Sequence, residues 1–176
     1  VSQTPSGKYY ASILFEYEDQ VQEKELQKFL GLDFSMHELY RDSNGKEPAY
    51  PGYYRNAEKK LAREQRKLSK MQKGSNNRNK QRLKVAKLHE KVSNQRKDFL
   101  HKQSRQITNA YDCVCIEDLD MKAMSRSLNL GKSVSDNGWG MFTTFLRYKL
   151  EEQGKKLVKV DRFFASSQTC SVVHNY

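Results

Sequence analysis

The sequence lacks the features of a membrane protein or of a disulfide-stabilised secreted protein. No apolar run approaches the roughly 18 residues that a membrane-spanning helix needs, and the polar residues 1–7 do not have the pattern of a signal peptide. The three cysteines, Cys113, Cys115 and Cys170, are an odd number, and two of them alternate in one apolar run, so they do not form a disulfide framework. These absences predict a cytoplasmic protein with no membrane partner.

Two common kinds of catalytic site are also missing. The four histidines are scattered, so no Ser/His/Asp constellation can be identified. Gly131, Lys132 and Ser133 resemble the end of a phosphate-binding P-loop, but Arg126 stands where its first glycine is required. The sequence therefore supports neither a serine triad nor a P-loop nucleotide site.

Negative charge is scarce in one long stretch, residues 55–105. This stretch holds 18 lysines and arginines against four acids, a net charge of +14, whereas the whole chain is +11, so the remainder sums to −3. Too few acids lie at helical i,i+4 spacing to neutralise it. Such a concentration of positive charge is typical of a surface that binds DNA or RNA. The alternative is a solvated helical face that only keeps the protein soluble.

Two helices are predicted in this stretch, as an antiparallel hairpin over residues 53–109. Apolar residues recur at a/d spacing over residues 54–71 and again over 85–99, and Gly74 to Asn77 break the pattern between them. Glu64 interrupts the first apolar seam. A narrow seam leaves most of each helix surface free, and the best candidates for nucleic-acid contacts on that surface are Lys59, Lys60, Arg63, Arg66, Lys67, Lys70, Arg78, Lys80, Arg82, Lys84 and Lys87.

Strands are predicted from runs of aromatic, β-branched and other apolar residues. These runs cover residues 8–16, 29–34, 111–119 and 156–161. The run at residues 111–119 has acids at its end, but Val114 and Ile116 with the two cysteines make a nearly continuous apolar stretch, as in a strand buried on both faces. Cys113 and Cys115 are interpreted as inert buried thiols. A turn signal at residues 42–45 predicts a hairpin toward Pro48.

A further amphipathic helix is predicted over residues 136–153, with Gly154 at its C-cap. Trp139, Phe142 and Phe145 have helical spacing and are interpreted as core residues, the alternative being a platform on which bases stack. The order strand, hairpin, helices, strand, helix, strand predicts an α/β or α+β domain around a central sheet.

Two carboxylates stand in strand-like apolar surroundings, Asp33 in LGLDFS and Glu117 in VCIEDL. Charged residues are rarely buried unless they are paired or bind a metal. A carboxylate on each of two central strands suits a divalent metal that hydrolyses phosphodiesters, and Mg²⁺ prefers such hard oxygen ligands. The alternative is that each acid caps its strand and faces water. Asp118 and Asp120 are predicted to be loop or helix-cap acids.

Several segments, in this order, resemble one protein family. They are SGKYYASILFEYE, FLGLDFSMHELYRDSNGKEPAYPGYYRNAEKKLAREQRKLSK, QRLKVAKLHEKVSNQRKDFLHK, VCIEDLDMKAM, GKSVSDNGWGMF and KLVKVDRFFASSQTCS. Over residues 6–171 the chain resembles TnpB, also called OrfB, the insertion-sequence transposase-associated protein. TnpB is an RNA-guided nuclease family related to type V CRISPR effectors.

The resemblance implies a RuvC nuclease domain of the RNase H-like fold, with a mixed sheet and an inserted, long, antiparallel basic helical hairpin. It implies that Asp33 and Glu117 are catalytic Mg²⁺ ligands for RNA-guided DNA cleavage in transposition or recombination. The hairpin is then expected to lie against guide RNA and target heteroduplex, where the protein reads backbone and shape. The implied partners are nucleic acids.

The resemblance also implies a truncated copy. The family's third catalytic acid lies in a DRDxNAA-like motif after a zinc ribbon, and Tyr176 comes before that point. Cys170 occupies a vestigial zinc position, but Val173 replaces the next cysteine, so zinc binding is not expected.

The expected division follows from these matches. Residues 1–18 are the last strand of a wedge-type domain, 19–28 a linker, 29–171 a partial RuvC domain, and 172–176 a divergent tail. With two of three acids, the chain is expected to bind nucleic acid without cleaving it. The alternatives are a non-enzymatic protein that binds nucleic acid through the hairpin, and a purely structural hairpin.

Overall fold

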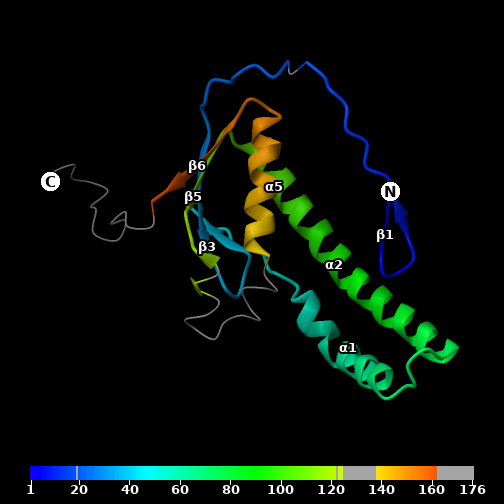
Figure 1. The fold of residues 1–176 in the computed structure, drawn as a ribbon. Helices are drawn as coiled ribbons and strands as arrows, with labels where there is room; N and C mark the ends of the chain where they lie inside the picture. The colour runs from blue at the N-terminus through cyan, green and yellow to red at the C-terminus, as the bar shows by residue number, and fades with distance from the viewer. Residues whose placement is uncertain (19, 122, 125–137, 162–176) are drawn as a thin grey trace.

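A four-stranded mixed sheet forms the body of the protein in the computed structural model, which describes residues 1–18, 20–121, 123–124 and 138–161. The strands are β3 (Phe29–Phe34), β4 (Tyr40–Asp42), β5 (Cys113–Glu117) and β6 (Lys156–Val160). Their order in the sheet is β4–β3–β5–β6, and Figure 1 labels β3, β5 and β6 side by side. β3, β5 and β6 are parallel, and β4 is antiparallel to β3. The sequence-based prediction of an α/β chain with a mixed sheet is therefore confirmed.

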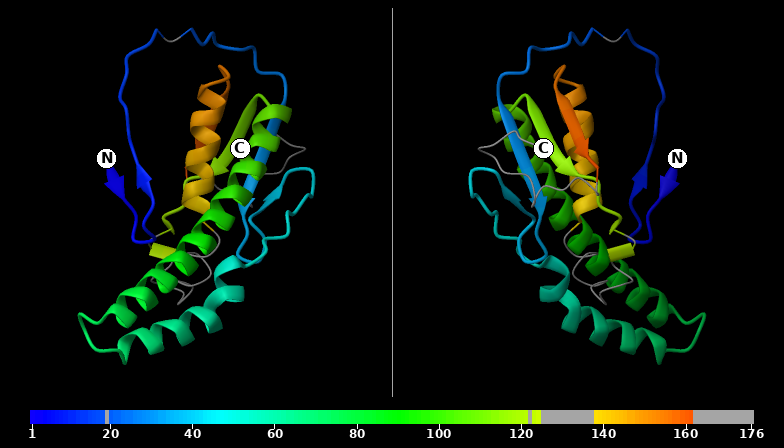
Figure 2. Two further views of the ribbon diagram at one scale, coloured as in Figure 1. Left: turned by 90° about the vertical axis from the view of Figure 1, so that its right-hand side faces the viewer. Right: turned by 90° about the vertical axis from the view of Figure 1, so that its left-hand side faces the viewer.

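Helices cover one face of this sheet. α5 (Trp139–Glu151) and the C-terminal part of α2 (Asn76–Ala110) pack on it, while α1 (Tyr53–Ser69) lies against the first part of α2 and projects with it away from the sheet (Figures 1 and 2). The two helices reproduce the predicted hairpin within a residue of its expected ends. Among the described residues, no helix combines the length and apolar character needed to cross a membrane.

The core lies between the sheet and the two helices that cover it. Its buried side chains are Leu30, Leu32, Leu39, Tyr40, Leu100, Ile107, Val114, Ile116, Trp139, Phe142, Leu146 and Leu150. Trp139 and Phe142 are thus core residues, as predicted, and Phe145 packs at the edge of the core. Because alternate residues of a strand point to opposite faces, Asp33 and Glu117 lie on the face that these helices do not cover.

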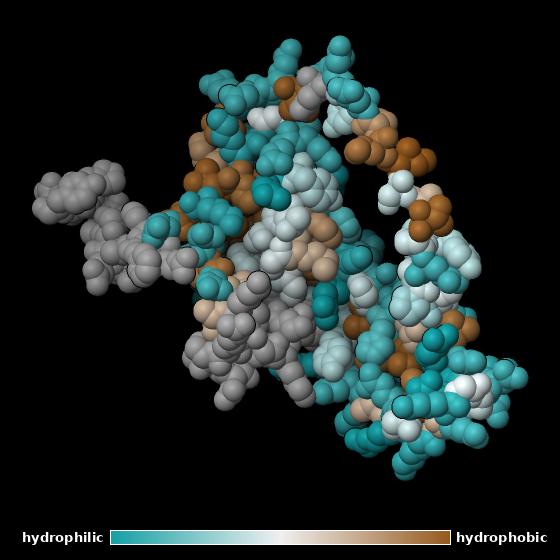
Figure 3. Space-filling model, viewed as in Figure 1, coloured by the Kyte–Doolittle hydropathy of each residue, from teal (hydrophilic) through white to brown (hydrophobic). Residues whose placement is uncertain are grey.

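The N-terminal segment forms less strand than its sequence predicts. β1 (Ser2–Gln3) pairs with β2 (Tyr9–Tyr10), but residues 11–16 pair with no described strand. Ile13, Leu14 and Phe15 are exposed, and apolar side chains are visible along the arch that leads to β3 (Figure 3). The aromatic and β-branched content was correctly recognised, but a strand also needs a partner, which the described residues do not provide.

The linker after this arch is held to the body at two points. The Asp112 carboxylate accepts hydrogen bonds from Lys24 Nζ at 3.0 Å and from the Lys28 backbone N–H at 3.1 Å. Gly154 has a φ of 68°, and a Cβ there would lie 1.9 Å from the carbonyl oxygen of Gln22, so only glycine fits.

The helix α5 ends earlier than predicted, with Glu152 as its C-cap.

Candidate functional site

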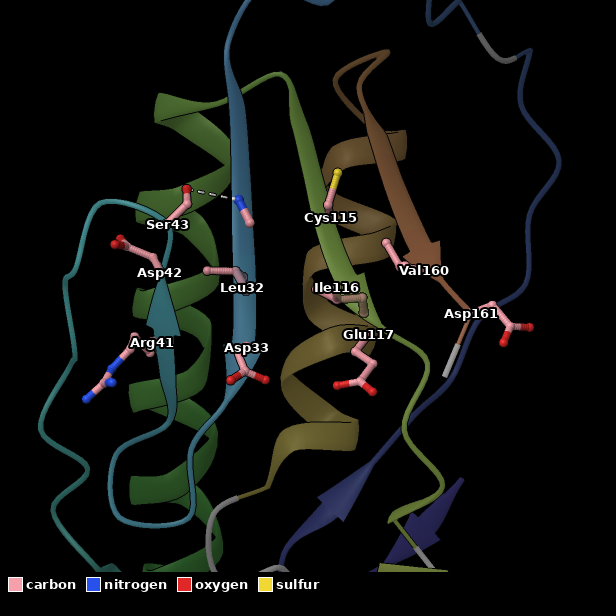
Figure 4. Close-up of a pocket in the computed structure, with 11 residues that line it drawn as sticks. Leu32, Asp33, Arg41, Asp42, Ser43, Cys115, Ile116, Glu117, Val160 and Asp161 are labelled. Atoms are coloured by element: carbon pink, nitrogen blue, oxygen red, sulfur yellow. Dashed lines mark hydrogen bonds between the residues drawn. The ribbon is translucent and has the colours of Figure 1, made fainter. Parts of the chain in front are cut away.

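The structure brings Asp33 and Glu117 together near the carboxyl ends of two neighbouring parallel strands. They directly follow Leu32 and Ile116, which are partners in the register of β3 and β5. Parallel neighbours lie about 4.8 Å apart and point their partnered side chains to the same face. Figure 4 accordingly shows the two carboxylates next to each other on one side of the sheet.

Both carboxylates line an open depression of about 440 Å³. Asp33 is exposed and Glu117 is half-buried. Neither side chain has an ion pair or hydrogen bond with a described residue. Arg41 of β4 is the register partner of Asp33, but its side chain pairs with Glu47 instead. Two negative side chains therefore share this depression without a positive partner from the described part of the chain.

This arrangement fits a hydrated Mg²⁺ ion. Mg²⁺ keeps several water molecules and is usually bound through one or two carboxylates, and the open depression leaves room for water. No group of three possible protein ligands exists within the described ranges. Asp161, at the rim of the depression, points away from the pair (Figure 4), and Asp42 accepts hydrogen bonds from the backbone N–H groups of Asn44 and Lys46.

The neighbouring acids have protein partners of their own, and the neighbouring thiols differ in burial. Asp118 pairs with Lys159 at 2.9 Å, and Asp120 accepts a hydrogen bond from the Ala123 backbone N–H at 3.0 Å, as predicted for loop and helix-cap acids. Cys113 is buried, as predicted, which raises the pKa of its thiol. The prediction is wrong for Cys115, which is only half-buried because it lies on the sheet face that lines the depression. Cys170, the predicted vestigial zinc position, lies outside the described residues.

The basic hairpin is closed by a narrow seam. Leu61 from α1 and Val85 and Val92 from α2 are buried there. At the start of α2, the Ser75 hydroxyl accepts a hydrogen bond from the Arg78 backbone N–H at 3.2 Å, the usual function of an N-cap serine. The predicted antiparallel pair with its break near Gly74 is confirmed.

Glu64 does more than interrupt this seam. It is 1% exposed, and its carboxylate accepts a hydrogen bond from Gln81 at 2.9 Å and pairs with Lys84 Nζ at 3.0 Å. Gln81 also donates to the Glu64 carbonyl oxygen at 3.0 Å. The hydrogen bonds from Gln81 and Lys84 lower the pKa of Glu64 to about 2. These contacts between Glu64 and α2 were not predicted from the sequence. The signal for them was a single acid at a seam position, surrounded by basic residues.

We expect the stabilisation by Glu64 to disappear in acid. Its pKa is about 2 in the folded protein and about 4.3 in an unfolded chain, so its stabilising effect is complete above pH 4.3 and is lost as the pH falls toward 2. Thermal melts of wild type and Glu64→Gln should differ most near neutral pH and converge between these values. A difference that stays constant down to pH 2 would contradict this assignment.

The predicted nucleic-acid contacts fall into two groups. All eleven are exposed except Arg78, which is half-buried. Arg63, Lys67 and Lys84 lie 3.4, 3.7 and 3.0 Å from the Glu64 carboxylate and so contribute to the closure of the hairpin. The remaining eight have no ion pair with a described residue, and the projecting end of the hairpin is largely hydrophilic in Figure 3.

Comparison with known proteins identifies the chain's relatives. The OrfB_IS605 family model, "Probable transposase", matches residues 12–128, and the Cas12f1-like TNB domain model matches residues 139–175. A "Putative RNA-guided DNA endonuclease" of Streptomyces pristinaespiralis is 34% identical over 97% of this chain and 42% of its own length. The "Putative RNA-guided DNA endonuclease InsQ" of Escherichia coli K12 is 32% identical over 94% of this chain and 44% of its own length.

The chain thus spans less than half the length of these two relatives. The family model nevertheless covers the carboxylate pair and the entire basic hairpin. On these matches, the chain belongs to the OrfB (TnpB) family of insertion-sequence transposases.

Proposed function

We propose that this chain is the RuvC-type nuclease part of an RNA-guided DNA endonuclease, with an RNase H-like fold. Residues 29–171 form that part, residues 1–18 the end of a wedge-type domain, and residues 19–28 the linker. The observation that carries the proposal is the pair Asp33 and Glu117 on adjacent parallel strands, without a positive partner from the described residues. The names of the two relatives support the same activity.

In this proposal Asp33 and Glu117 hold Mg²⁺. The ion supplies Lewis-acid stabilisation of the charge that develops during phosphodiester hydrolysis. The carboxylates fix its position on the rigid sheet, and the open depression admits a nucleic-acid strand. The hairpin, which projects away from the body (Figure 1), holds the sugar–phosphate backbone of guide RNA and target DNA through its eight cations that have no ion pair with a described residue.

A non-enzymatic role as a nucleic-acid clamp is the second candidate. It is favoured by a contrast among the described residues: the hairpin has many cations without an ion pair, whereas only two carboxylates lie next to each other in the depression. A two-metal hydrolysis site usually needs more ligands than two side chains supply. Residues 1–176 alone are therefore expected to bind RNA or an RNA–DNA hybrid in a salt-sensitive way without cleaving either.

Direct metal binding tests the carboxylate pair. Titration of the chain with Mn²⁺, followed by its electron paramagnetic resonance signal, should show one site in wild type. Asp33→Asn and Glu117→Gln should each weaken it by about tenfold or more, because each removes half of the protein's ligand charge. Neither variant should lower the melting temperature in metal-free buffer, since each removes a like-charge neighbour.

Glu151→Gln is the matched control. Glu151 is an exposed acid on α5 with no ion pair to a described residue, so its variant should bind Mn²⁺ as wild type does. Equal affinities in wild type, Asp33→Asn and Glu117→Gln would show that the two acids only face water and would refute the proposed metal site. Mg²⁺-dependent cleavage by wild type that persists in Asp33→Asn would refute its catalytic role.

A further inference from the structure

A second polar pocket lies where the last turns of α2 meet α5. It has a volume of about 490 Å³, and no acid from the described part of the chain lines it. Its lining includes the cations Lys102, Arg105 and Lys149, together with His101, Gln106 and Asn109. Lys102 pairs with Asp98 at 2.7 Å, so Arg105 and Lys149 are the cations without an ion pair to a described residue. Donor groups predominate around this pocket, which favours an anionic ligand.

Lys149 is the unusual member of this group. It is 3% exposed, yet its Nζ acceptors among the described residues are both neutral, the His101 carbonyl oxygen at 2.9 Å and the Ser104 hydroxyl at 2.7 Å. The other buried lysine among the described residues, Lys155, lies 3.7 Å from the Asp112 carboxylate. An ammonium has three N–H donors, and burial of its charge is costly, which lowers the pKa of Lys149. The nearby Arg105 lowers this pKa further, and Glu152 offsets part of the shift. A bound anion would offset that cost.

Aromatic packing holds Lys149 in place. The His101 ring stacks on Phe145 with centroids 3.8 Å apart and an interplanar angle of 12°. Lys149 Nζ lies 5.6 Å from the Phe145 centroid and 5.9 Å from that of Tyr148, within the range of cation–π attraction. The ammonium is therefore positioned before any ligand arrives, which reduces the entropy lost on binding.

Arg105 supplies the exposed side of the pocket. Its planar guanidinium matches the geometry of a phosphate and can bind it through two parallel hydrogen bonds. Lys149 adds a fixed point charge from the neighbouring helix. A buried ammonium and an exposed guanidinium around one cavity are the elements of a phosphate site.

The same helix connects this pocket to the basic hairpin. Lys87 and Arg105 are 18 residues apart in α2, which is five full turns of an α-helix and a rise of roughly 27 Å. Because five full turns return to the same direction around the helix axis, the two residues lie on the same side of α2, and both side chains are exposed. A sugar–phosphate backbone that follows α2 from the hairpin toward the body would thus meet the pocket.

We propose that the pocket between α2 and α5 binds a backbone phosphate of the nucleic-acid strand, through Arg105 and Lys149. This inference rests on the proposed function and extends the nucleic-acid surface from the hairpin to the helical layer of the body. The pocket is distinct from the carboxylate pair, which lies on the opposite face of the sheet.

Salt-dependent affinity for a labelled RNA hairpin tests the proposal. Arg105→Gln should weaken binding about fivefold near 0.1 M salt and reduce the slope of log affinity against log salt concentration by about one, as expected for one lost phosphate contact. Lys149→Met, which retains the length and the apolar contacts of the side chain, should act in the same direction. Arg147→Gln is the matched control, because Arg147 is an exposed cation of α5 outside the pocket.

The variants separate the possible failures. Arg105 is exposed, so its substitution leaves folding intact, and thermal melts establish whether Lys149→Met is folded. If Arg105→Gln matches Arg147→Gln while substitutions in the hairpin abolish binding, the pocket assignment is wrong and the proposed function stands. If wild type binds no RNA at low salt, the proposed function fails and the pocket assignment with it. If inorganic phosphate raises the melting temperature of wild type but not of Arg105→Gln, without any change in RNA affinity, the pocket binds free phosphate and not a strand.

Discussion

Replacing Lys59, Lys60, Arg66 and Lys70 of α1 with glutamine is expected to lower affinity for an RNA–DNA hybrid by about 10³ near 0.15 M salt. All four are exposed and have no ion pair with a described residue. Each phosphate contact contributes about 0.7 to 0.9 to the salt slope, so losing four should reduce that slope by about three. Filter binding over a range of salt concentrations measures both quantities.

A second fourfold variant controls for net charge. Lys28, Lys46, Arg147 and Lys156 are exposed cations outside the hairpin, and their change to glutamine removes the same total charge. If the two variants lose affinity equally, attraction is a property of the whole molecule and the hairpin is a solvated face. The hairpin variant should also fold at least as well as wild type, because it removes like-charge repulsion along α1. Its lost affinity could then not be ascribed to unfolding.

Local sequence patterns predicted most of the body. Residues 29–34 and 156–160 form strands where their composition indicated, and the helical hairpin follows from apolar spacing and a break at Gly74. The predicted strand over residues 8–16 is mostly absent, because pairing depends on a partner that a local pattern does not specify. Local composition determines which residues favour a strand, whereas the tertiary fold determines whether that strand forms.

In the candidate sites, too, local sequence indicated some residues, whereas the tertiary fold determined which residues come together. Apolar surroundings singled out Asp33 and Glu117, but their adjacency depends on the parallel register of β3 and β5, which a long helical crossover sets. Sequence reasoning gave no role to Lys149, since a lysine in an amphipathic helix is usually exposed. Only the packing of α5 against α2 shows that Lys149 is buried between Ser104 and Phe145.

Phe142→Ala is expected to destabilise the body by about 3 to 5 kcal/mol, the usual loss for a buried phenylalanine. Phe142 is fully buried, stacks on Tyr40 with centroids 5.5 Å apart, and contacts Trp139 with centroids 5.7 Å apart. It therefore joins α5 to β4 at the edge of the sheet. The melting temperature should fall by roughly 10 °C, and because Trp139 is the only tryptophan of the chain, its fluorescence monitors unfolding of this layer.

Phe142→Leu distinguishes a packing defect from a general intolerance to substitution. Leucine retains much of the buried volume, so its cost should stay near 1.5 kcal/mol or below. Equal losses for the two variants would contradict the central packing role of Phe142.

The stacked partner Tyr40 belongs to β4, which pairs with β3 beside Asp33. Phe142→Ala should therefore also weaken Mn²⁺ binding at temperatures near its melt, because the carboxylate pair depends on an intact β3 and β5. Where α1 and α2 remain helical, the affinity of the hairpin for RNA should decline less than that for Mn²⁺, since Glu64 and the α1–α2 seam close the hairpin independently of Phe142.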